Sequence, residues 1–399
     1  TYIGQSSNVV VPSYLGPNKV IGILEGAFSY TDIESIVLPT TVEELQGAVF
    51  TNNNNLTSLD LSNTQVEHLS DQAIYRNEQL TNLSLPYQLQ TIGKQSVADN
   101  PNLASLIIPS SVTEIEYEAF MNNESLQQIQ LPSSLYAIEG NVFLGSSSLL
   151  SIQIDGSNGY FSTLDGVLYD KQKDSLFIYP EGKQTINFTA PSTVNYLGKH
   201  SFANNSYLQT VNLNQTKVIY EEAFLNATSL SNISAQALES VKQNAFYQTA
   251  WFEQQGDIAV LGDVLVKYKG TSEFFDGSLI PQTVRTVGSG AFSNTNIVQL
   301  QMPSFVEVIE NDAFSQMKQI EDIYVLGNPF IDANAFGDTI NENTRLLLPL
   351  SLHTTLINDN YYDQSFKAHL VPIKSTLYLY SGDTYSSIDV YYGEPYELP

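Results

Sequence analysis

Four histidines and no cysteine limit the chemistry that this chain of 399 residues can perform. His68, His200, His353 and His369 are widely separated, and no pair has the His-x-x-x-His spacing of a metal site. The absence of cysteine excludes thiol nucleophiles, thiolate zinc sites and disulfides. No Gly-x-Ser-x-Gly motif and no glycine-rich phosphate loop occurs. We therefore expect no enzymatic activity, no cofactor and no essential metal.

Two acidic pairs, Glu43-Glu44 and Glu221-Glu222, are the remaining candidates for acid–base chemistry. Glu43 and Glu44 stand between the apolar residues Val42 and Leu45, a pattern typical of a solvated strand edge. A glycosidase pair of carboxylates needs a cleft and a set separation, which this pattern does not predict. We interpret both pairs as surface carboxylates.

The segment from Asp155 to Gly159 has a composition that suits either a calcium loop or a turn. A calcium loop needs several spaced carboxylates, and this segment has one. A turn is the favoured interpretation, and calcium remains the alternative.

The balance of acidic and basic residues limits the classes of molecule that this chain is expected to bind. The chain has 16 Lys plus Arg against 42 Asp plus Glu, for a formal net charge of −26. Nucleic acid and anionic membranes are bound through clustered basic side chains, so neither is an expected partner. The excess of acid favours solubility, with a cationic partner or divalent ions as the alternatives. No apolar run approaches the roughly 18 residues of a membrane span, so no membrane insertion is expected.

One pattern recurs along the chain. Its clearest copy runs from Leu126 to Phe143 as Leu-x-x-Ile-x-Leu-Pro, then Leu-x-x-Ile, then Val-Phe, and the copy before it runs from Leu103 to Phe120. Each copy ends on a large apolar residue, here called the anchor. Most anchors are 22 to 24 residues apart, but two steps are 59 and 46 residues long. The twelve anchors are Phe28, Phe50, Ile74, Val97, Phe120, Phe143, Phe202, Phe224, Phe246, Phe292, Phe314 and Phe336.

The physics of one copy predicts a stack. The end of Leu-x-x-Leu-x-Leu alternates as a strand does, with its apolar residues on one face. The proline that follows cannot donate to a strand ladder, and Val-x-x-Ile then forms a second short extended segment. A single copy cannot cover its own apolar face, so the copies must pack on one another.

These motifs resemble the BspA-like leucine-rich-repeat family, the type also found in Treponema surface antigens. The matching runs include Ile107 to Val112 and Val284 to Phe292. The resemblance implies a β-rich, right-handed, curved solenoid of about twelve repeats over residues 1–373. Many members of the family have cysteine three residues after the anchor. This chain instead has Asn123, Ser146, Asn205, Ala227, Thr295 and Met317 there, a difference that we expect to change packing and not fold.

The two long steps predict hairpin insertions at about 155–185 and 251–278. In the first, Asp165-Gly166 stands between apolar runs, which is a strong hairpin signal. The second begins at Trp251 and continues past Gly262-Asp263 to Tyr268. We expect both insertions to cover the stack, with a recognition loop as the alternative.

The C-terminal region changes character. Residues 346–373 resemble the helix-containing cap that closes arrays of this family. Residues 374–399 predict a β tail, and the run from Val390 to Pro399 resembles the start of a Listeria–Bacteroides B-repeat, a small wall-associated β domain. At the other end, the chain begins within the pattern near Asn8, which predicts an export segment upstream.

The ligand-binding candidates follow from the alternation of the strands. The x positions of Leu-x-x-Leu-x-Leu must face outward, and successive copies place them side by side. This strand face is polar and has few aromatic side chains, which suits an extended peptide or a glycan, although any solvated sheet needs polar residues. The inserted hairpins, with Tyr160 and Trp251, are the rival location. The strand-face candidates are Gln128, Gln130, Gln209, Asn212, Asp322 and Tyr324.

Adhesion is the function that the family resemblance implies. We expect a non-catalytic, monomeric protein at the bacterial cell surface, in the cell wall or secreted, which binds a host protein, a matrix component or a glycan. The alternative is a passive spacer that displays another domain. A binder should have a chemically distinct patch, whereas a spacer should look uniform.

Overall fold

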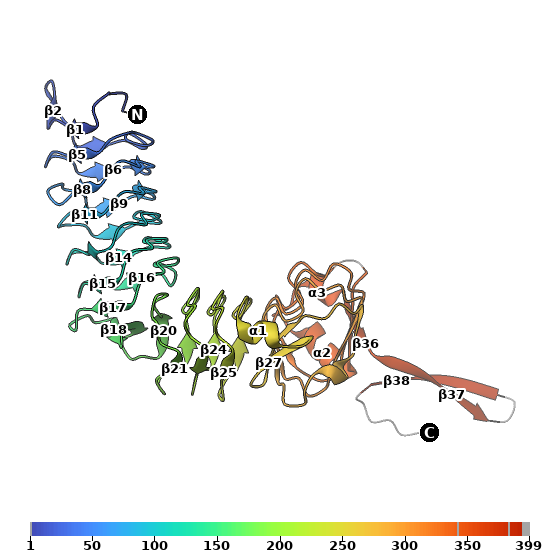
Figure 1. Ribbon diagram of the computed structural model, residues 1–399. Coiled ribbons are helices and arrows are strands. Elements are labelled where there is room, and N and C mark those ends of the chain that lie inside the picture. Colours follow the sequence, from blue (N-terminus) through green and yellow to red (C-terminus); the bar gives the residue numbers. More distant parts are fainter. Residues whose placement is uncertain (1, 341–342, 382–383, 393–399) are drawn as a thin grey trace. The chain divides into compact units, whose positions relative to one another are not determined.

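The computed structural model describes residues 2–340, 343–381 and 384–392 (Figure 1). The chain divides into two compact units, each built from stacked repeats. Unit 1 comprises residues 1–233 and 244–253, and unit 2 comprises residues 234–243 and 254–399. Each unit is described by itself. The prediction that residues 1–373 form a single solenoid stays a prediction.

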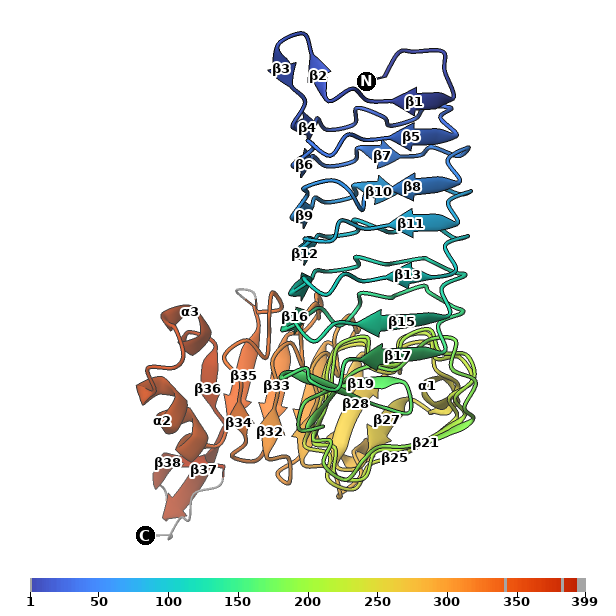
Figure 2. The same ribbon diagram turned by 90° about the vertical axis from the view of Figure 1, so that its left-hand side faces the viewer.

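Each repeat of unit 1 begins with a short strand on the Leu-x-Leu segment. These strands pair in parallel and in register, for example Leu59 with Leu83, and they lie one above another in Figure 2. Their side chains alternate between buried and exposed, as the sequence predicts. We call this surface the strand face. Its strands are β1 (Asn8–Val10), β5 (Ser35–Val37), β8 (Ser58–Asp60), β11 (Asn82–Ser84), β13 (Leu106–Ile107), β15 (Gln128–Leu131) and β17 (Ser151–Ile154).

The Val-x-x-Ile segments form a second parallel sheet, here called the second sheet. It pairs Ile92 with Ile115 and Leu45 with Leu69, so apolar residues of successive repeats lie side by side. A hairpin of β2 (Tyr14–Leu15) and β3 (Asn18–Lys19) precedes it, and β7 (Phe50–Thr51) pairs with β10 (Ile74–Tyr75) at the anchors. The second sheet consists of β4 (Gly22–Ile23), β6 (Glu44–Leu45), β9 (His68–Leu69), β12 (Thr91–Ile92), β14 (Glu114–Ile115) and β16 (Ala137–Ile138).

The anchors form stacks of rings inside each unit. Phe28 and Phe50 have ring centroids 5.7 Å apart, Phe202 and Phe224 are 4.7 Å apart, and all four are buried. Stacked and edge-on aromatic pairs add stability beyond their area burial. All twelve anchors named from the sequence are buried.

The stack has somewhat more repeats than the expected number of about twelve, because the two long steps each contain a further anchor. The Tyr179 amide donates to the Ser201 carbonyl at 2.7 Å, the same bond that Phe202 makes to Ala223 one repeat later. The Tyr179 ring lies 4.8 Å from that of Phe202. Tyrosine did not match the Phe or aliphatic pattern, although its ring fills the same volume.

Tyr268 is the second anchor of this kind. Its amide donates to the Ala291 carbonyl at 2.8 Å, and its ring is 5.9 Å from that of Phe292. The inserted segments are therefore repeats of the stack to which a hairpin has been added, and the number of anchors rises from twelve to fourteen.

The first inserted segment contains two antiparallel pairs. β18 (Phe161–Leu164) and β19 (Val167–Asp170) are joined by the two-residue turn at Asp165-Gly166, as the sequence predicts, and both turn residues have positive φ. β20 (Ser175–Ile178) pairs antiparallel with β19. It also pairs in parallel with β22 (Tyr196–Leu197), a strand of the next repeat.

The remaining strands of the first unit continue the two rows. β25 (Asn232–Ser234) and α1 (Ala250–Gln254) stand along the chain at the boundary between the units. The continuing strands are β21 (Asn187–Thr189), β22 (Tyr196–Leu197), β23 (Thr210–Asn212) and β24 (Val218–Ile219).

Unit 2 repeats the arrangement with longer strands. β27 (Ile258–Leu261) and β28 (Val264–Tyr268) form the second hairpin. β28 also pairs in parallel with β30 (Thr286–Val287) of the next repeat. The segment from Trp251 was predicted to start this hairpin, but Trp251 lies in helix α1. The other elements are β26 (Ser240–Val241), β29 (Phe274–Phe275), η1 (Gly277–Leu279), β30 (Thr286–Val287), β31 (Gln299–Met302), β32 (Val308–Ile309), β33 (Asp322–Val325), β34 (Phe330–Ile331), β35 (Arg345–Leu348) and β36 (Leu370–Pro372).

Two helices lie where the resemblance implies a cap. α2 (Leu350–Asn358) and α3 (Gln364–Lys367) follow the last repeat, and Phe366 of α3 packs 5.7 Å from the Phe336 anchor. An aromatic residue thus covers the end of the ring stack, which would otherwise be exposed.

Strands β37 (Lys374–Ser381) and β38 (Thr384–Tyr391) form an antiparallel hairpin after the cap. The Lys374 ammonium and the Asp389 carboxylate join its two strands at 2.7 Å. The predicted B-repeat resemblance runs from Val390 to Pro399, of which residues 393–399 lie outside the described residues. That this tail begins another domain stays a prediction.

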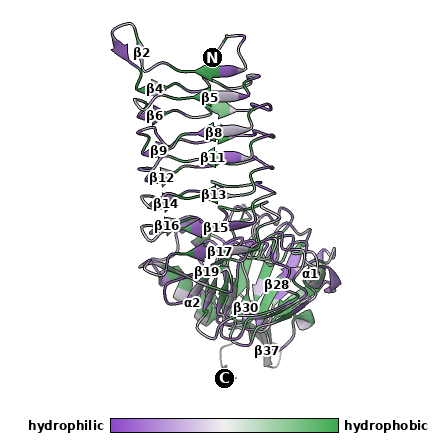
Figure 3. Ribbon diagram, turned by 60° about the vertical axis from the view of Figure 1, so that its left-hand side comes forward, coloured by the Kyte–Doolittle hydropathy of each residue, from purple (hydrophilic) through white to green (hydrophobic). Residues whose placement is uncertain are grey.

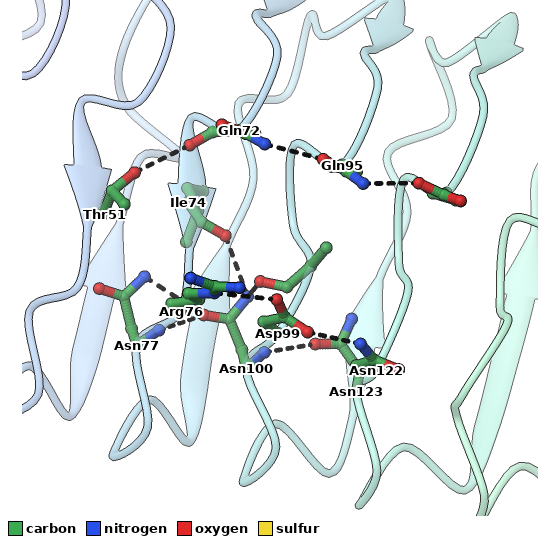
Figure 4. Close-up of polar contacts among 12 residues, drawn as sticks. Thr51, Gln72, Ile74, Arg76, Asn77, Gln95, Asp99, Asn100, Asn122 and Asn123 are labelled. Atoms are coloured by element: carbon green, nitrogen blue, oxygen red, sulfur yellow. Dashed lines mark hydrogen bonds and ion pairs between the residues drawn. The ribbon is translucent and has the colours of Figure 1, made fainter.

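Buried asparagines connect the turns of unit 1 (Figure 4). The Asn100 side-chain oxygen accepts from the Asn77 amide at 3.1 Å, and its Nδ2 donates to the Ile74 carbonyl at 3.0 Å. Asn123 repeats the contact one repeat later, accepting from the Asn100 amide at 3.0 Å. Since this is the position where relatives have cysteine, the expected change in packing is a ladder of side-chain amides that satisfies buried backbone groups.

Replacing Asn100 with Ala should lower the free energy of unfolding by about 2–4 kcal/mol, because at least two buried backbone groups lose their partners. The measurement is urea denaturation followed by circular dichroism. Asn63→Ala, at an exposed turn of the same unit, is the matched control and should change stability little. Equal midpoints for the two variants would contradict the role of the ladder.

Glu181 joins three repeats of unit 1 from a buried position. One carboxylate oxygen accepts from the Gly145 amide at 2.7 Å and from the Asn204 side chain at 3.1 Å. Burial nevertheless dominates and raises the pKa of Glu181 from 4.5 to about 7, while these two hydrogen bonds lower it. The folded state therefore favours the protonated carboxyl, and this contribution to stability is complete below pH 4.5 and is lost as the pH rises through 7.

The Glu181→Gln variant should be more stable than the parent at high pH, because it never places a charge in this site. We expect an advantage that is small at pH 5 and about 2–3 kcal/mol at pH 8.5. Thermal or urea unfolding at both pH values measures it. Glu78→Gln, an exposed carboxylate of the same unit, controls for net charge. An advantage of Glu181→Gln that does not change with pH would refute the assignment.

Candidate functional site

The strand face of unit 1 presents the predicted glutamines to solvent. Gln128 and Gln130 of β15 are exposed, while Ile129 and Leu131 between and after them are buried. Gln130 pairs in register with Gln153 of β17, so amide side chains of adjacent repeats lie side by side. These side chains can donate and accept hydrogen bonds.

The other predicted residues are less available to a ligand. Gln209 is exposed, but Asn212 of β23 is half-buried and accepts from the Asn214 amide at 3.0 Å. In unit 2, Asp322 receives two hydrogen bonds from the Arg345 guanidinium, at 2.7 and 2.8 Å, and this pairing raises the pKa of Arg345. Tyr324 is half-buried on the same strand.

The six candidates are distributed over three sheets. Gln128 and Gln130 belong to one sheet of unit 1, Asn212 belongs to another sheet of that unit with Gln209 beside it, and Asp322 and Tyr324 belong to a sheet of unit 2.

A cavity of about 450 Å³ lies on the strand face, lined by residues of the repeats that contain β8, β11 and β13. β8 and β11 belong to one hydrogen-bonded sheet, and β13 belongs to the next. We call this feature the strand-face cavity. β11 contributes polar residues to the lining and is coloured as hydrophilic in Figure 3. The lining includes Asp60, Thr81, Asn82, Ser84, Tyr87 and Ile107.

Tyr87 and Ile107 are the residues that sequence reasoning missed. They are 76% and 84% exposed, and both adjoin polar side chains in the lining of the same cavity. Ile107 occupies an outward x position, and Tyr87 follows Pro86 where several other copies have Ser or Thr. A search for apolar residues at outward positions could have found both. An aromatic face beside amides and hydroxyls can hold a sugar ring or an extended peptide.

Of the two residues predicted for the rival site at the hairpins, only Tyr160 is exposed. Tyr160 is 61% exposed, and its ring is 6.1 Å from that of Tyr136. Trp251, however, is buried, with its ring 4.8 Å from that of Phe246. Trp251 thus closes a ring stack of unit 1, and this placement removes it from the exposed candidates.

Several of the titratable side chains singled out in the sequence have structural partners. His200 Nε2 lies 2.6 Å from the Glu222 carboxylate, and Lys19 pairs with Glu43 at 3.1 Å. Asp155 accepts from the Ser157 amide at 2.9 Å and from its hydroxyl at 2.6 Å, which lowers the pKa of Asp155 and supports the turn interpretation. Among the described residues, no three His, Asp or Glu side chains are grouped closely enough to hold a metal ion.

Comparison with protein families gives a clear match. The model of the BspA type leucine-rich repeat region matches six copies, in residues 21–150, 177–254 and 275–367. The chain belongs to the BspA-type leucine-rich repeat family. No protein with a curated description matches it in sequence.

Several solved structures of leucine-rich-repeat and related proteins share the fold. The pneumococcal vaccine antigen PcpA is 22% identical, with a TM-score of 0.60 over 91% of this chain and 86% of that one. A leucine-rich cell surface protein from Faecalibacterium prausnitzii is 21% identical, with a TM-score of 0.50 over 82% and 89% of the two chains. A leucine-rich repeat protein from Eubacterium ventriosum is 18% identical, with the same TM-score over 86% and 88%. At these identities the likeness concerns the fold.

Within the described ranges, none of the helices is both long and apolar enough to cross a lipid bilayer.

The burial of Trp251 can be tested by fluorescence, because it is the one tryptophan of the chain. We expect emission at short wavelength and strong protection from iodide, since the ring packs against Phe246 in the core. Free N-acetyltryptophanamide sets the unprotected limit, and the urea-unfolded protein should approach it. Quenching of the folded protein at that limit would return Trp251 to the exposed candidates.

Proposed function

We propose that this protein is a non-catalytic, adhesin-like binding protein, secreted by a bacterium or held at its surface. It presents the strand face of unit 1 to a host protein, a matrix component or a glycan. The observation that carries the proposal is the strand-face cavity, where exposed Tyr87 and Ile107 lie beside the polar side chains of β11. Family membership and the cell-surface relative from Faecalibacterium support the location.

A passive spacer is less consistent with this surface. A spacer needs only a uniform solvated face, and exposed apolar side chains in a cavity add an aggregation risk that a spacer has no reason to keep. The strand face changes from polar at Gln128 and Gln130 to mixed apolar and polar at the cavity. Such local contrast is what a binding site requires.

The strand face is long enough to contact an extended ligand. Parallel strands are spaced about 4.8 Å apart, so side chains in register form rows along the stack. Asn82 of β11 pairs with Ser58, and Gln128 pairs with Ser151, which places donors and acceptors at regular intervals. Extended binding surfaces of this kind are characteristic of solenoid proteins.

The test compares two variants on arrays of matrix proteins and glycans. The cavity variant combines Asn82→Lys, Ser84→Lys and Tyr87→Ala, and should lose at least tenfold in affinity for the ligand of the parent protein, since a central aromatic contact accounts for much of the energy of an interface. The matched control combines Asn54→Lys, Asn55→Lys and Tyr14→Ala, at exposed positions of the same unit. The control should bind as the parent does.

Absence of any ligand on such arrays, or equal affinities of the cavity variant and the parent, would reject the strand-face cavity as the binding site. Adding Gln128→Lys and Gln130→Lys in a separate variant shows how far the footprint extends along the face.

A further inference from the structure

A second cavity of unit 1 lies on the second sheet, where the first hairpin meets β14 and β16. Its volume is about 610 Å³. Phe161 and Phe177 of the hairpin form an edge-on pair 5.6 Å apart in its wall, and Tyr117 and Tyr136 present partly exposed rings. We call it the aromatic–acidic groove.

Four carboxylates surround these rings. Asp71, Glu114, Glu116 and Glu139 all line the groove, and none of them forms an ion pair with a basic side chain in the part of the chain that the structure describes. Glu114 accepts a hydrogen bond from the Tyr136 hydroxyl, which orients that ring at the edge of the groove. Lys94 is the one basic side chain in the lining, so the groove keeps a local excess of negative charge.

Lys94 also shows how a cation sits in this groove. Its ammonium lies over the Tyr117 ring, 5.3 Å from the ring centroid. Attraction between a cation and an aromatic face is worth more than that of an exposed ion pair when the site is partly desolvated. Tyr136 and Tyr160 offer further rings, 6.1 Å apart.

We propose that the aromatic–acidic groove binds lysine and arginine side chains from an extended basic segment of a partner protein. Charge complementarity carries this assignment, because the unpaired carboxylates attract cations and the rings can cover their alkyl stems. The net charge of −26 steers a basic segment toward the protein as a whole.

The second sheet extends the surface beyond the groove. Glu43, Glu44 and Glu67 line a further cavity of about 660 Å³ on β6 and β9 of the same sheet. From β6 to β16 there are four strand steps, roughly 19 Å at about 4.8 Å each, which is the length of about six extended residues. A basic segment lying across the strands would therefore meet carboxylates at both ends.

A neutral glycan fits the groove less well. Sugar hydroxyls need both donors and acceptors, whereas ionised carboxylates only accept. The groove lining has four carboxylates and one lysine, so the affinity for a ligand should depend on the charge of that ligand. The proposal goes beyond the function assigned to the strand face and does not depend on it, since the two cavities lie on different sheets.

The probe is a fluorescein-labelled peptide of eight alternating lysine and glycine residues, titrated with the full chain and followed by fluorescence anisotropy. The groove variants are Glu116→Gln with Glu139→Gln, and separately Tyr136→Leu. Both should weaken peptide binding roughly tenfold, and binding by the parent should weaken between about 50 mM and about 300 mM salt. Circular dichroism melting of each variant checks that it is folded.

Matched controls separate the groove from general attraction to an acidic protein. Glu78→Gln with Glu124→Gln removes the same charge from exposed turns of unit 1, and Tyr14→Leu removes an exposed ring elsewhere. Both controls should stay within about twofold of the parent, because surface charges away from a contact add little. Tyr87→Ala should also leave peptide affinity unchanged, which keeps this test separate from that of the strand-face cavity.

Three outcomes would overturn the proposal: no peptide binding by the parent, equal loss in the groove variants and their controls, or displacement of the peptide by a neutral oligosaccharide whose own affinity does not depend on salt. The last outcome would assign the groove to a glycan.

Discussion

Every repeat of this protein depends on its neighbour to cover an apolar face that it cannot cover alone. The strands have only two to eight residues, and most have two to four, so a single repeat gains too little from its own hydrogen bonds to be stable. Parallel pairing in register solves this, because it places Leu59 against Leu83 and Ile92 against Ile115. The aromatic stacks and the asparagine ladder are consequences of the same register, since identical positions of successive repeats must meet.

This constraint divides the side chains into two groups. Inward positions are held to apolar residues or to amides such as Asn77 and Asn100 that satisfy the turns. Outward positions have no role in the stack and are free to differ between repeats. Both cavities arise from that freedom: the strand-face cavity from exposed Tyr87 and Ile107, and the aromatic–acidic groove from rings and carboxylates on the second sheet.

The buried titratable groups are used to join repeats. Glu181 accepts from Gly145 and Asn204, and Glu310 pairs with Lys242 at 3.2 Å while accepting from the Ser289 amide at 3.1 Å. Lys267 donates to the Gly290 and Ser293 carbonyls, and burial lowers its pKa to about 8. Each such contact joins different turns of one unit. The perturbed pKa values of Glu181 and Lys267 therefore have a structural cause, which is burial at the contacts that join repeats.

The sequence by itself determined the repeat, its period, the alternation of inward and outward residues and the Asp165-Gly166 turn, because each follows from residues within one copy. Tertiary structure decided what depends on neighbours about 23 positions away or on the ends of the stacks. It made Tyr179 and Tyr268 into anchors, since a tyrosine ring fills the volume of phenylalanine when its register is right. It buried Trp251 on Phe246 and paired Asp322 with Arg345. It also placed residues from the repeats of β8, β11 and β13 around one cavity, because register, spacing and side-chain size from several repeats together set where a stacked sheet is hollowed.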